Sequence, residues 1–396
     1  MTSKRLLIHL LGQIAFGMLA MTLCLPSMQD WSRIFNASPA QVQLSFAGYV
    51  VAFGAMQLFY GPWSDRWGRK PVLLAGLSLA FIGFVLAALA TQLPVLIAAR
   101  VLQGAGTSAG MVIGRAMVQD VYQGADRTRA MAYIGMAMGV SPPLATWVGG
   151  HLHQTLGWQA NFVLAACLGG GLMLSAAWGL PAQVASARGS AGLRPHWLAD
   201  MLRAYRQLFG KPRFVQYVAL LAFTYATLYA FFSGVPAVLA SYGVGPASMG
   251  GYFACMTVSY IAGSFLTSRW VQALGERGVM AWGQASTFTG VGLMLLMALT
   301  GQPVVLAVAL PLIFIGLGHG LLVPSALAGS VGQIPALAGA AAGMAGLMQQ
   351  LMGAVGSYAV GLLPHQGSAA MASLMLLFSL LALAMQWLLH RRRDDR

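Results

Sequence analysis

Long apolar runs alternate with short polar connections from one end of the chain to the other. A helix needs about 20 mostly apolar residues to cross a bilayer. Twelve runs are long enough, and most of their connections are short, which predicts antiparallel neighbouring helices. The predicted spans are 6–28, 41–61, 71–91, 95–118, 129–150, 160–180, 213–237, 248–270, 279–299, 304–325, 338–361 and 369–389.

The longest connection, 181–212, is polar and separates six predicted spans from six more. The inner turn after the second span and that after the eighth are both basic and contain glycine, which suggests duplicated repeats, as in many secondary transporters. We therefore predict an all-α membrane protein with an N-terminal half (1–180), a cytoplasmic linker (181–212), a C-terminal half (213–390) and a basic cytoplasmic tail (391–396).

Composition agrees with a bilayer as the solvent. Only 8% of the 396 residues are charged and 58% are hydrophobic, whereas a soluble protein has about a quarter of its residues charged. The first apolar run is also longer than the core of a typical signal peptide, so it is interpreted as a first span.

Lysine and arginine positions predict the orientation, because cytoplasmic loops of membrane proteins are enriched in both. With a cytoplasmic N-terminus and twelve spans, nineteen of the 22 basic residues lie inside and Arg33 alone lies outside; Arg100 and Arg115 fall within spans. Both termini are then cytoplasmic, and a bacterial inner membrane is the expected location. The net charge of +14 is explained by this inner surface, so we expect no nucleic-acid partner.

The turn "GPWSDRWGRKP" concentrates charge in a chain that otherwise avoids it. A topological loop, with glycines and prolines that stop two helices, explains Arg66, Arg69 and Lys70. It leaves Asp65 unexplained, since acidic residues contribute little to topology. A topological loop also leaves unexplained the strict order of Gly61, Asp65, Arg66, Gly68, Arg69 and Lys70.

The fourth predicted span carries Arg100, Gln103 and Gly104. An arginine inside a membrane is costly and suggests function, although its side chain could instead extend to the outer interface. Near the inner end of this span, Arg115 and Asp120 are five residues apart and are poor partners on one helix. We expect them to meet the charged turn, either as an inner-surface ion-pair network or as part of coupling.

These segments resemble the major facilitator superfamily, and within it the bicyclomycin/chloramphenicol-resistance branch of the drug:proton antiporters. The similarity is carried by "GPWSDRWGRKPVLLAG", "ARVLQGAGTSAGMVIGRAMVQDVY" and "SPPLATWVGG". It implies that Asp65 pairs with basic groups to latch the inner side, so that the charged turn acts as a gate. The residues of this predicted gate are Gly61, Asp65, Arg66, Gly68, Arg69 and Lys70. Pro142, Gly149 and Gly150 resemble the antiporters' fifth-helix signature, which implies a kinked helix approached closely by the other half. The alternative is a kink with no bearing on transport direction.

The chain departs from this family where relatives carry an acid in the first span, because Thr22 stands there. Asp30 is the nearest acid, and it could couple protons or merely solvate a helix end. His319 is an alternative, since histidine changes charge near neutral pH, but it could be a packed core residue. The predicted proton-coupling residues are Asp30, Arg100, Asp120 and His319.

Polar and aromatic side chains inside the spans are predicted to contact substrate. Their spacing is equally compatible with packing, and a pocket is favoured because the family has a central cavity. The predicted residues are Tyr49, Gln57, Tyr225, Tyr229, Phe232, Gln349, Gln350 and Tyr358.

These features predict a proton-driven exporter of amphipathic small molecules that works by alternating access as a monomer. The alternative is a dedicated exporter or proton symporter of one metabolite, such as a siderophore or a sugar. The only Gly-Lys pair is followed by Pro212, so no nucleotide-binding loop is present. We expect no enzyme activity, metal or cofactor, with the proton gradient as energy source and lipid, protons and substrate as partners.

Overall fold

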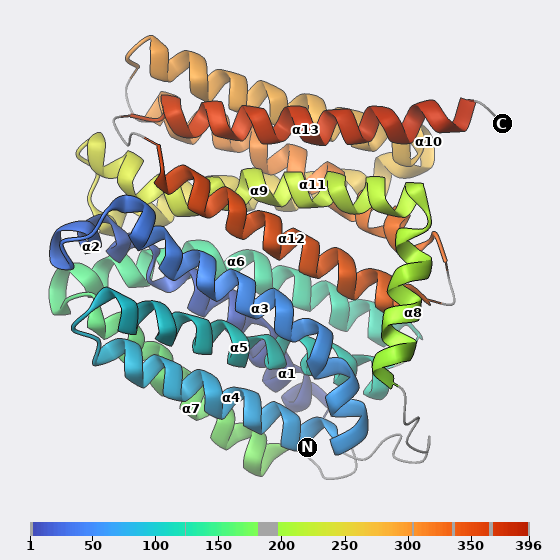
Figure 1. The fold of residues 1–396 in the computed structure, drawn as a ribbon, viewed down its shortest axis with the longest axis horizontal. Coiled ribbons are helices and arrows are strands. Elements are labelled where there is room, and N and C mark those ends of the chain that lie inside the picture. Colours follow the sequence, from blue (N-terminus) through green and yellow to red (C-terminus); the bar gives the residue numbers. More distant parts are fainter. Residues whose placement is uncertain are drawn as a thin grey trace. The chain divides into compact units, whose positions relative to one another are not determined.

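The regular structure of the described residues is entirely helical (Figure 1). The computed structural model describes residues 3–122, 124–180, 197–302, 305–334, 337–363 and 367–394. Residues 181–196, half of the predicted linker, lie outside this part, as do the last two residues of the tail. The chain divides into unit 1, Met1–Pro195 with Pro246–Gly250, and unit 2, His196–Gly245 with Gly251–Arg396.

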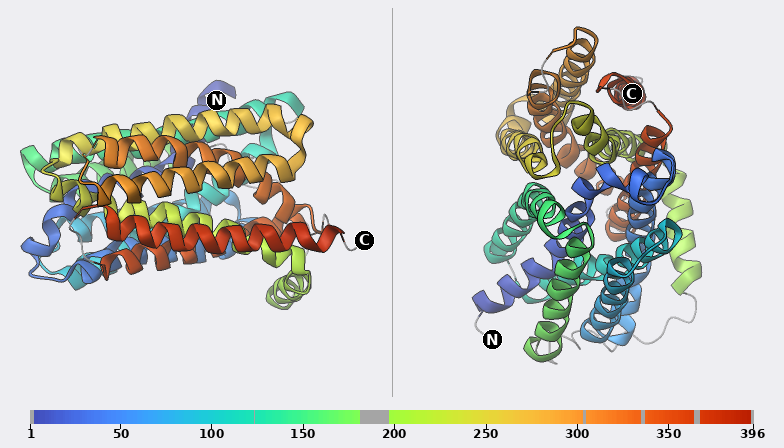
Figure 2. Two further views of the ribbon diagram at one scale, coloured as in Figure 1. Left: turned by 90° about the horizontal axis from the view of Figure 1, so that it is seen from above. Right: turned by 90° about the vertical axis from the view of Figure 1, so that its left-hand side faces the viewer.

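Unit 1 contains the helices of the first half of the chain, and Figure 2 shows them running roughly side by side. They are α1 (Ser3–Leu23), the 3-10 turn η1 (Leu25–Ser27), α2 (Met28–Ile34), α3 (Pro39–Trp67), α4 (Arg69–Ala88), α5 (Leu93–Val121), α6 (Gly124–Leu156) and α7 (Gln159–Gly179), with η2 (Pro246–Ser248).

Unit 2 contains a second bundle and one helix that crosses it. Its members are α8 (Trp197–Phe209), α9 (Pro212–Ser241), α10 (Met249–Leu299), the π-helix η3 (Val305–Ala309), α11 (Leu310–Val331), α12 (Ala338–Gly361) and α13 (Ala369–Asp394). In Figure 1, α8 runs crosswise to α9, with Leu208 buried in the unit 2 core. Burial also raises the pKa of the Tyr205 phenol on α8.

The close packing of α3, α4 and α5 depends on glycine. A Cβ at Gly104 of α5 would meet the backbone of Tyr49 on α3, and one at Gly106 would meet Gly76 and Ala80 on α4. Membrane helices gain little from the hydrophobic effect between them, so small residues that let backbones approach are the main source of contact. Glycine in α5 therefore sets how near Arg100 comes to its neighbours.

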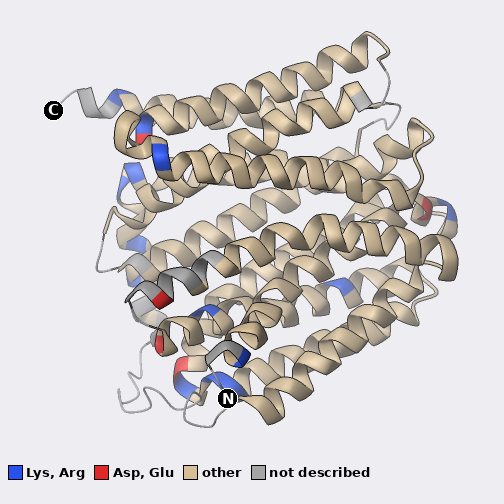
Figure 3. Ribbon diagram, turned by 180° about the vertical axis from the view of Figure 1, so that it is seen from behind, with Lys and Arg blue, Asp and Glu red and all other residues tan. Residues whose placement is uncertain are grey.

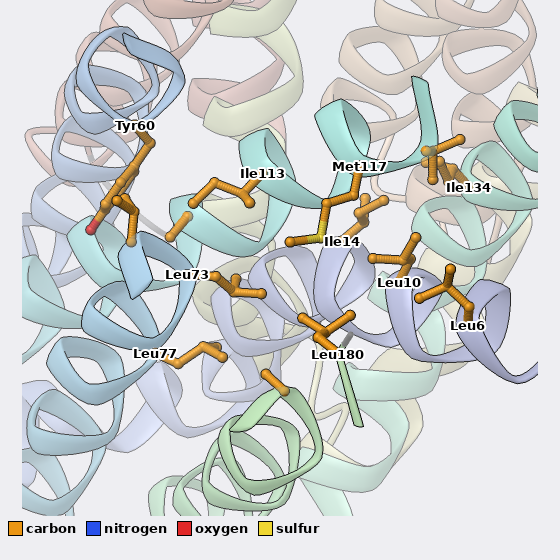
Figure 4. Packing of buried hydrophobic residues seen from close by; sticks show 14 of the residues in the cluster. Leu6, Leu10, Ile14, Tyr60, Leu73, Leu77, Ile113, Met117, Ile134 and Leu180 are labelled. Atoms are coloured by element: carbon orange, nitrogen blue, oxygen red, sulfur yellow. The ribbon is translucent and has the colours of Figure 1, made fainter. Parts of the chain in front are cut away.

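An apolar cluster fills the interior of unit 1 between α1, α4, α5 and α6 (Figure 4). Leu10 and Ile14 of α1 pack with Ile113 and Met117 of α5, and Leu73 of α4 joins them. Fixing α1 against α5 in this way holds the end of α1 beside the first turns of α5.

Helices cover the predicted spans with shifted ends, and two boundary expectations were wrong. Gly61 and Pro62 do not stop a helix, since α3 continues to Trp67 and only Gly68 separates it from α4. Gly68 has φ of 91°, a conformation that only glycine adopts without strain. The predicted connection 271–278 is likewise helical except at Gly275, where α10 breaks into two arms.

Nine segments of the described residues have the length and hydropathy to cross a membrane. One of them, Pro246–Leu299, contains both arms of α10, while α6 and α12 fall outside the nine. The protein is therefore an all-helical, multi-pass membrane protein.

Candidate functional site

Arg100 is completely buried in the second turn of α5. Its Nη1 donates hydrogen bonds to the Ala20 carbonyl at 3.2 Å and to Gln103 Oε1 at 2.7 Å, and its Nη2 donates to the Met21 carbonyl at 3.3 Å. The guanidinium also lies 4.3 Å from the centre of the Tyr49 ring. The side chain is thus fixed inside unit 1, and the alternative that it extends to the outer interface is wrong.

The carbonyls that hold Arg100 belong to the last turn of α1. The end of a helix carries unsatisfied carbonyls and a partial negative charge, and here α1 ends before η1, where Pro26 supplies no N–H. Thr22, one residue beyond Met21, is also buried and donates to the Met18 carbonyl at 3.0 Å. A guanidinium is therefore stabilised at this point by dipoles rather than by a carboxylate.

Tyr49 ties three helices together beside Arg100. Its hydroxyl donates to the Gly17 carbonyl at 2.7 Å and lies 2.7 Å from Thr107 Oγ1. Thr107 in turn donates to the Gln103 carbonyl at 2.8 Å. Tyr49, predicted to contact substrate, is fully buried in this network, so any contact with substrate requires these helices to separate.

Asp30 on α2 and His153 in the last turn of α6 are in side-chain contact across 123 positions of sequence. Asp30 Oδ2 lies 2.8 Å from His153 Nε2, and Asp30 Oδ1 accepts from Arg33 at 2.9 Å. His153 is 10% exposed and Asp30 33%. The Nδ1 atom of His153 is buried without a hydrogen-bond partner among the described residues. Carboxyl and imidazole side chains both serve as proton donors and acceptors in proteins, so this contact is a candidate site of proton exchange.

The charged turn forms an ion-pair network centred on Arg69. Its Nη1 contacts Asp65 Oδ1 at 2.6 Å and donates to Ser64 Oγ at 2.6 Å, and its Nε donates to Asp120 Oδ2 at 3.3 Å. Arg69 and Asp120 are each 14% exposed, whereas Asp65 is 64% exposed. The network therefore joins the end of α3, the start of α4 and the end of α5.

The other members of the predicted gate differ in their contacts. Lys70 donates to the Leu180 carbonyl at 3.2 Å, and Arg66 lies 5.8 Å from the Trp67 ring centre. Arg115 contacts the Met138 sulfur at 3.3 Å. The structure thus joins Asp120 to the charged turn, as expected, and Arg115 reaches Met138 of α6.

The proline-glycine segment of α6 packs against α1 and η2. Pro142 and Pro143 lie inside the helix, and Gly149 faces the Leu23 carbonyl closely enough that a Cβ would clash. Gly150 makes a similar approach to Pro246. For Gly149 the close neighbour is therefore a helix of its own half, contrary to the expectation that the other half would approach it.

His319 lies buried in the middle of α11, and neither of its ring nitrogens has a hydrogen-bond partner among the described residues. Buried polar groups are usually paired, so this imidazole is exceptional. It belongs to unit 2, whereas Asp30 and Arg100 belong to unit 1.

The predicted aromatic stripe of α9 packs within unit 2. Tyr229 is 1% exposed, and its hydroxyl donates to Gln350 Oε1 at 2.7 Å. Phe232 is also buried, with its ring centre 5.0 Å from that of Phe253, while Tyr225 meets the Tyr229 ring edge-on. Tyr229 and Gln350 therefore act as a pair that joins α9 to α12.

The remaining predicted substrate contacts differ in how far they are enclosed. Gln57 on α3 is half-buried, Gln349 on α12 is buried and Tyr358 is exposed. Their role as substrate contacts stays a prediction.

Sequence reasoning missed His153 and the carbonyls of Ala20 and Met21. His153 carried a usable signal, since it is a histidine three residues beyond the outer end of the predicted span 129–150. The two carbonyls carried no signal in the sequence, because every residue has a carbonyl. Only the packing of α1 on α5 brings these two to Arg100.

Comparison with known proteins assigns this arrangement of helices. A family profile described as Major Facilitator Superfamily matches residues 10–357. Multidrug resistance protein D of Escherichia coli (strain K12) is 30% identical over 97% of this chain and 95% of its own length. Chloramphenicol resistance protein of Pseudomonas aeruginosa is 27% identical over 88% of this chain and 81% of its own length.

A solved structure gives the fold independently. The crystal structure of a bacterial homologue of the human lysosomal transporter Spinster, in an inward-facing and unoccupied conformation, superposes with a TM-score of 0.78. It covers 98% of this chain and 97% of its own chain at 16% identity. At that identity the likeness supports the fold alone.

Proposed function

The chain belongs to the Major Facilitator Superfamily, and from this premise we propose that it is a proton-coupled exporter of amphipathic small molecules, including antibiotics. The observation that carries the proposal is the similarity to a multidrug resistance protein over nearly the full length of both chains. Similarity to a chloramphenicol resistance protein over most of the chain supports the same class of substrate.

Proton exchange is assigned to Asp30 with His153, while Arg100 fixes the end of α1 nearby. Asp30 lies on α2, and η1 joins α2 to the end of α1. A change in the charge of Asp30 therefore acts on the segment that Arg100 holds. Binding of a proton and binding of substrate then favour different conformations, which is the requirement for coupled antiport. Energy comes from the proton gradient, without a bound cofactor.

The proposed topology has twelve spans and two cytoplasmic termini in a bacterial inner membrane. The segment Pro246–Leu299 holds both arms of α10 and so counts as two spans, which raises the nine apolar segments to ten spans. Adding α6 and α12 gives twelve. At 1.5 Å per residue, helices of 33 and 24 residues are long enough for a bilayer. The Arg69 network is then the inner latch, and the protein works as a monomer.

The alternative, a dedicated exporter or a proton symporter of one metabolite, has weaker support. The relatives whose names point to drug resistance match in sequence over most of the chain. No residue set in the described part of the chain favours a sugar or a siderophore over other small molecules.

Drug susceptibility in cells tests the proposal. The chain is expressed in a bacterium that lacks its own exporters, and the minimum inhibitory concentration of chloramphenicol is measured. Expression of the wild type is expected to raise it, whereas Asp30→Asn at equal membrane abundance is expected to give no protection. Equal protection by both chains would contradict the assignment of Asp30, and no protection by the wild type would contradict export of this drug.

A further inference from the structure

Acidic side chains avoid the middle of every described spanning helix. The whole chain contains eight Asp and Glu residues, and those in the described part lie near helix ends, beside the break in α10, or on α8. Figure 3 shows the same distribution, with red segments close to helix ends. The eight are Asp30, Asp65, Asp120, Asp126, Asp200, Glu276, Asp394 and Asp395.

Arg100 therefore places a positive charge inside unit 1 that no carboxylate neutralises. All of its described partners are neutral, being two carbonyls, one amide oxygen and one aromatic ring. Its Nε has no hydrogen-bond partner in the described part of the chain. Dipoles stabilise the guanidinium but leave its net charge in place.

A charge in such surroundings acts over a long distance. Two unit charges ~10 Å apart, at an effective dielectric constant of ~20, change a binding constant by about tenfold or more. A cation bound within the membrane-embedded part of unit 1 is repelled by Arg100 and finds no acid to offset the repulsion. An anion at the same place is attracted, and an uncharged molecule is unaffected.

Resting on the proposed export function, we propose that this transporter selects uncharged and anionic amphipathic molecules and discriminates against lipophilic cations. The selectivity follows from the positive charge of Arg100, which has no carboxylate partner among the described residues.

Two ions of the same shape and opposite charge test the proposal. Purified protein in detergent is loaded with radiolabelled chloramphenicol, which is uncharged, and the label is displaced with tetraphenylborate or tetraphenylphosphonium. Partition of each ion into protein-free micelles is measured and subtracted. The borate is expected to displace the label at about tenfold lower concentration or less. Equal potency, or stronger displacement by the phosphonium, would overturn the proposal.

A single substitution next to Arg100 supplies the matched comparison. Thr22→Asp places a carboxylate one residue beyond the Met21 carbonyl that Arg100 binds, so the preference for the borate is expected to fall about tenfold. Thr22→Val has similar volume and no charge, and is expected to keep the wild-type ratio. If Thr22→Asp and Thr22→Val shift the ratio equally, the effect is not electrostatic and the proposal is overturned.

The same measurement separates this proposal from the proposed function. If chloramphenicol fails to bind, the export assignment for that drug fails. The affinities of the two ions are then measured directly, by the change in tryptophan fluorescence on titration with each ion. A borate preference there supports charge selection on its own, whereas absence of borate binding contradicts it. If Thr22→Asp does not fold, the wild-type ratio still decides.

Discussion

At the scale of single residues, Arg100 shows how a buried cation is held by geometry. Its planar fork donates to carbonyls of α1 and to Gln103 at once, which a compact ammonium cannot reproduce. Arg100→Lys is expected to leave acceptors unpaired and lower the free energy of unfolding by about 1–3 kcal/mol. Thermal unfolding in detergent measures this, with the exposed Arg33→Lys as control. An equal change in both variants would contradict the assigned role.

His153 is the second residue with a specific expected outcome. Replacing it by Gln removes an imidazole, a group that can take up and release protons, from its contact with Asp30. The dependence of transport rate on outer pH is expected to become shallower. His151→Gln is the matched control, since the His151 side chain is exposed and meets the Trp147 carbonyl and ring on its own helix. A profile for His153→Gln identical to that of the wild type would count against the pair.

At the scale of elements, the contact of α3 with α5 depends on one glycine. A Cβ on Gly104 would meet the Tyr49 backbone, so Gly104→Ala is expected to destabilise the protein by about 1–3 kcal/mol through overpacking. Gly61→Ala is the control within α3, because nothing lies within 4 Å of its Cβ position. It is expected to stabilise the helix by roughly 0.5–1 kcal/mol. Thermal unfolding of the two variants in opposite directions is the expected result.

The turn between α3 and α4 gives the second prediction at this scale. Arg69→Gln removes contacts with both Asp65 and Asp120, leaving the partly buried Asp120 carboxylate without its cation. Transport is expected to fall several-fold and thermal stability by about 1–3 kcal/mol. Arg66 is exposed and has no described ion pair. Arg66→Gln is therefore expected to keep the transport rate and the thermal stability of the wild type. Equal loss in both variants would show that the turn needs only positive charge.

At the scale of the whole molecule, the helices could be predicted from the sequence because spanning lengths are set by the bilayer. The end of α3 could not be predicted, since Gly61 and Pro62 usually mark a stop. Here Arg69 binds Ser64 in the last turns of α3 and also Asp120 of α5, a contact across 51 positions of sequence. Local propensity is a weak guide where packing decides.

The site was only partly predictable for a related reason. Arg100 and Asp30 were identifiable as rare charged residues in or next to apolar runs. Their partners were not, because His153 lies 123 positions from Asp30, and the end of α1 about 80 positions from Arg100. Such pairs arise from the arrangement of helices, which residue type and spacing alone do not specify.

Drug-induced proton movement in reconstituted vesicles tests the central claim most directly. Purified protein is placed in vesicles with an acidic interior, chloramphenicol is added outside, and internal pH is followed with a trapped dye. Proton-coupled antiport predicts that drug entry is accompanied by proton release, absent in Asp30→Asn vesicles. Movement of drug and proton in the same direction, or drug movement without any pH change, would contradict it.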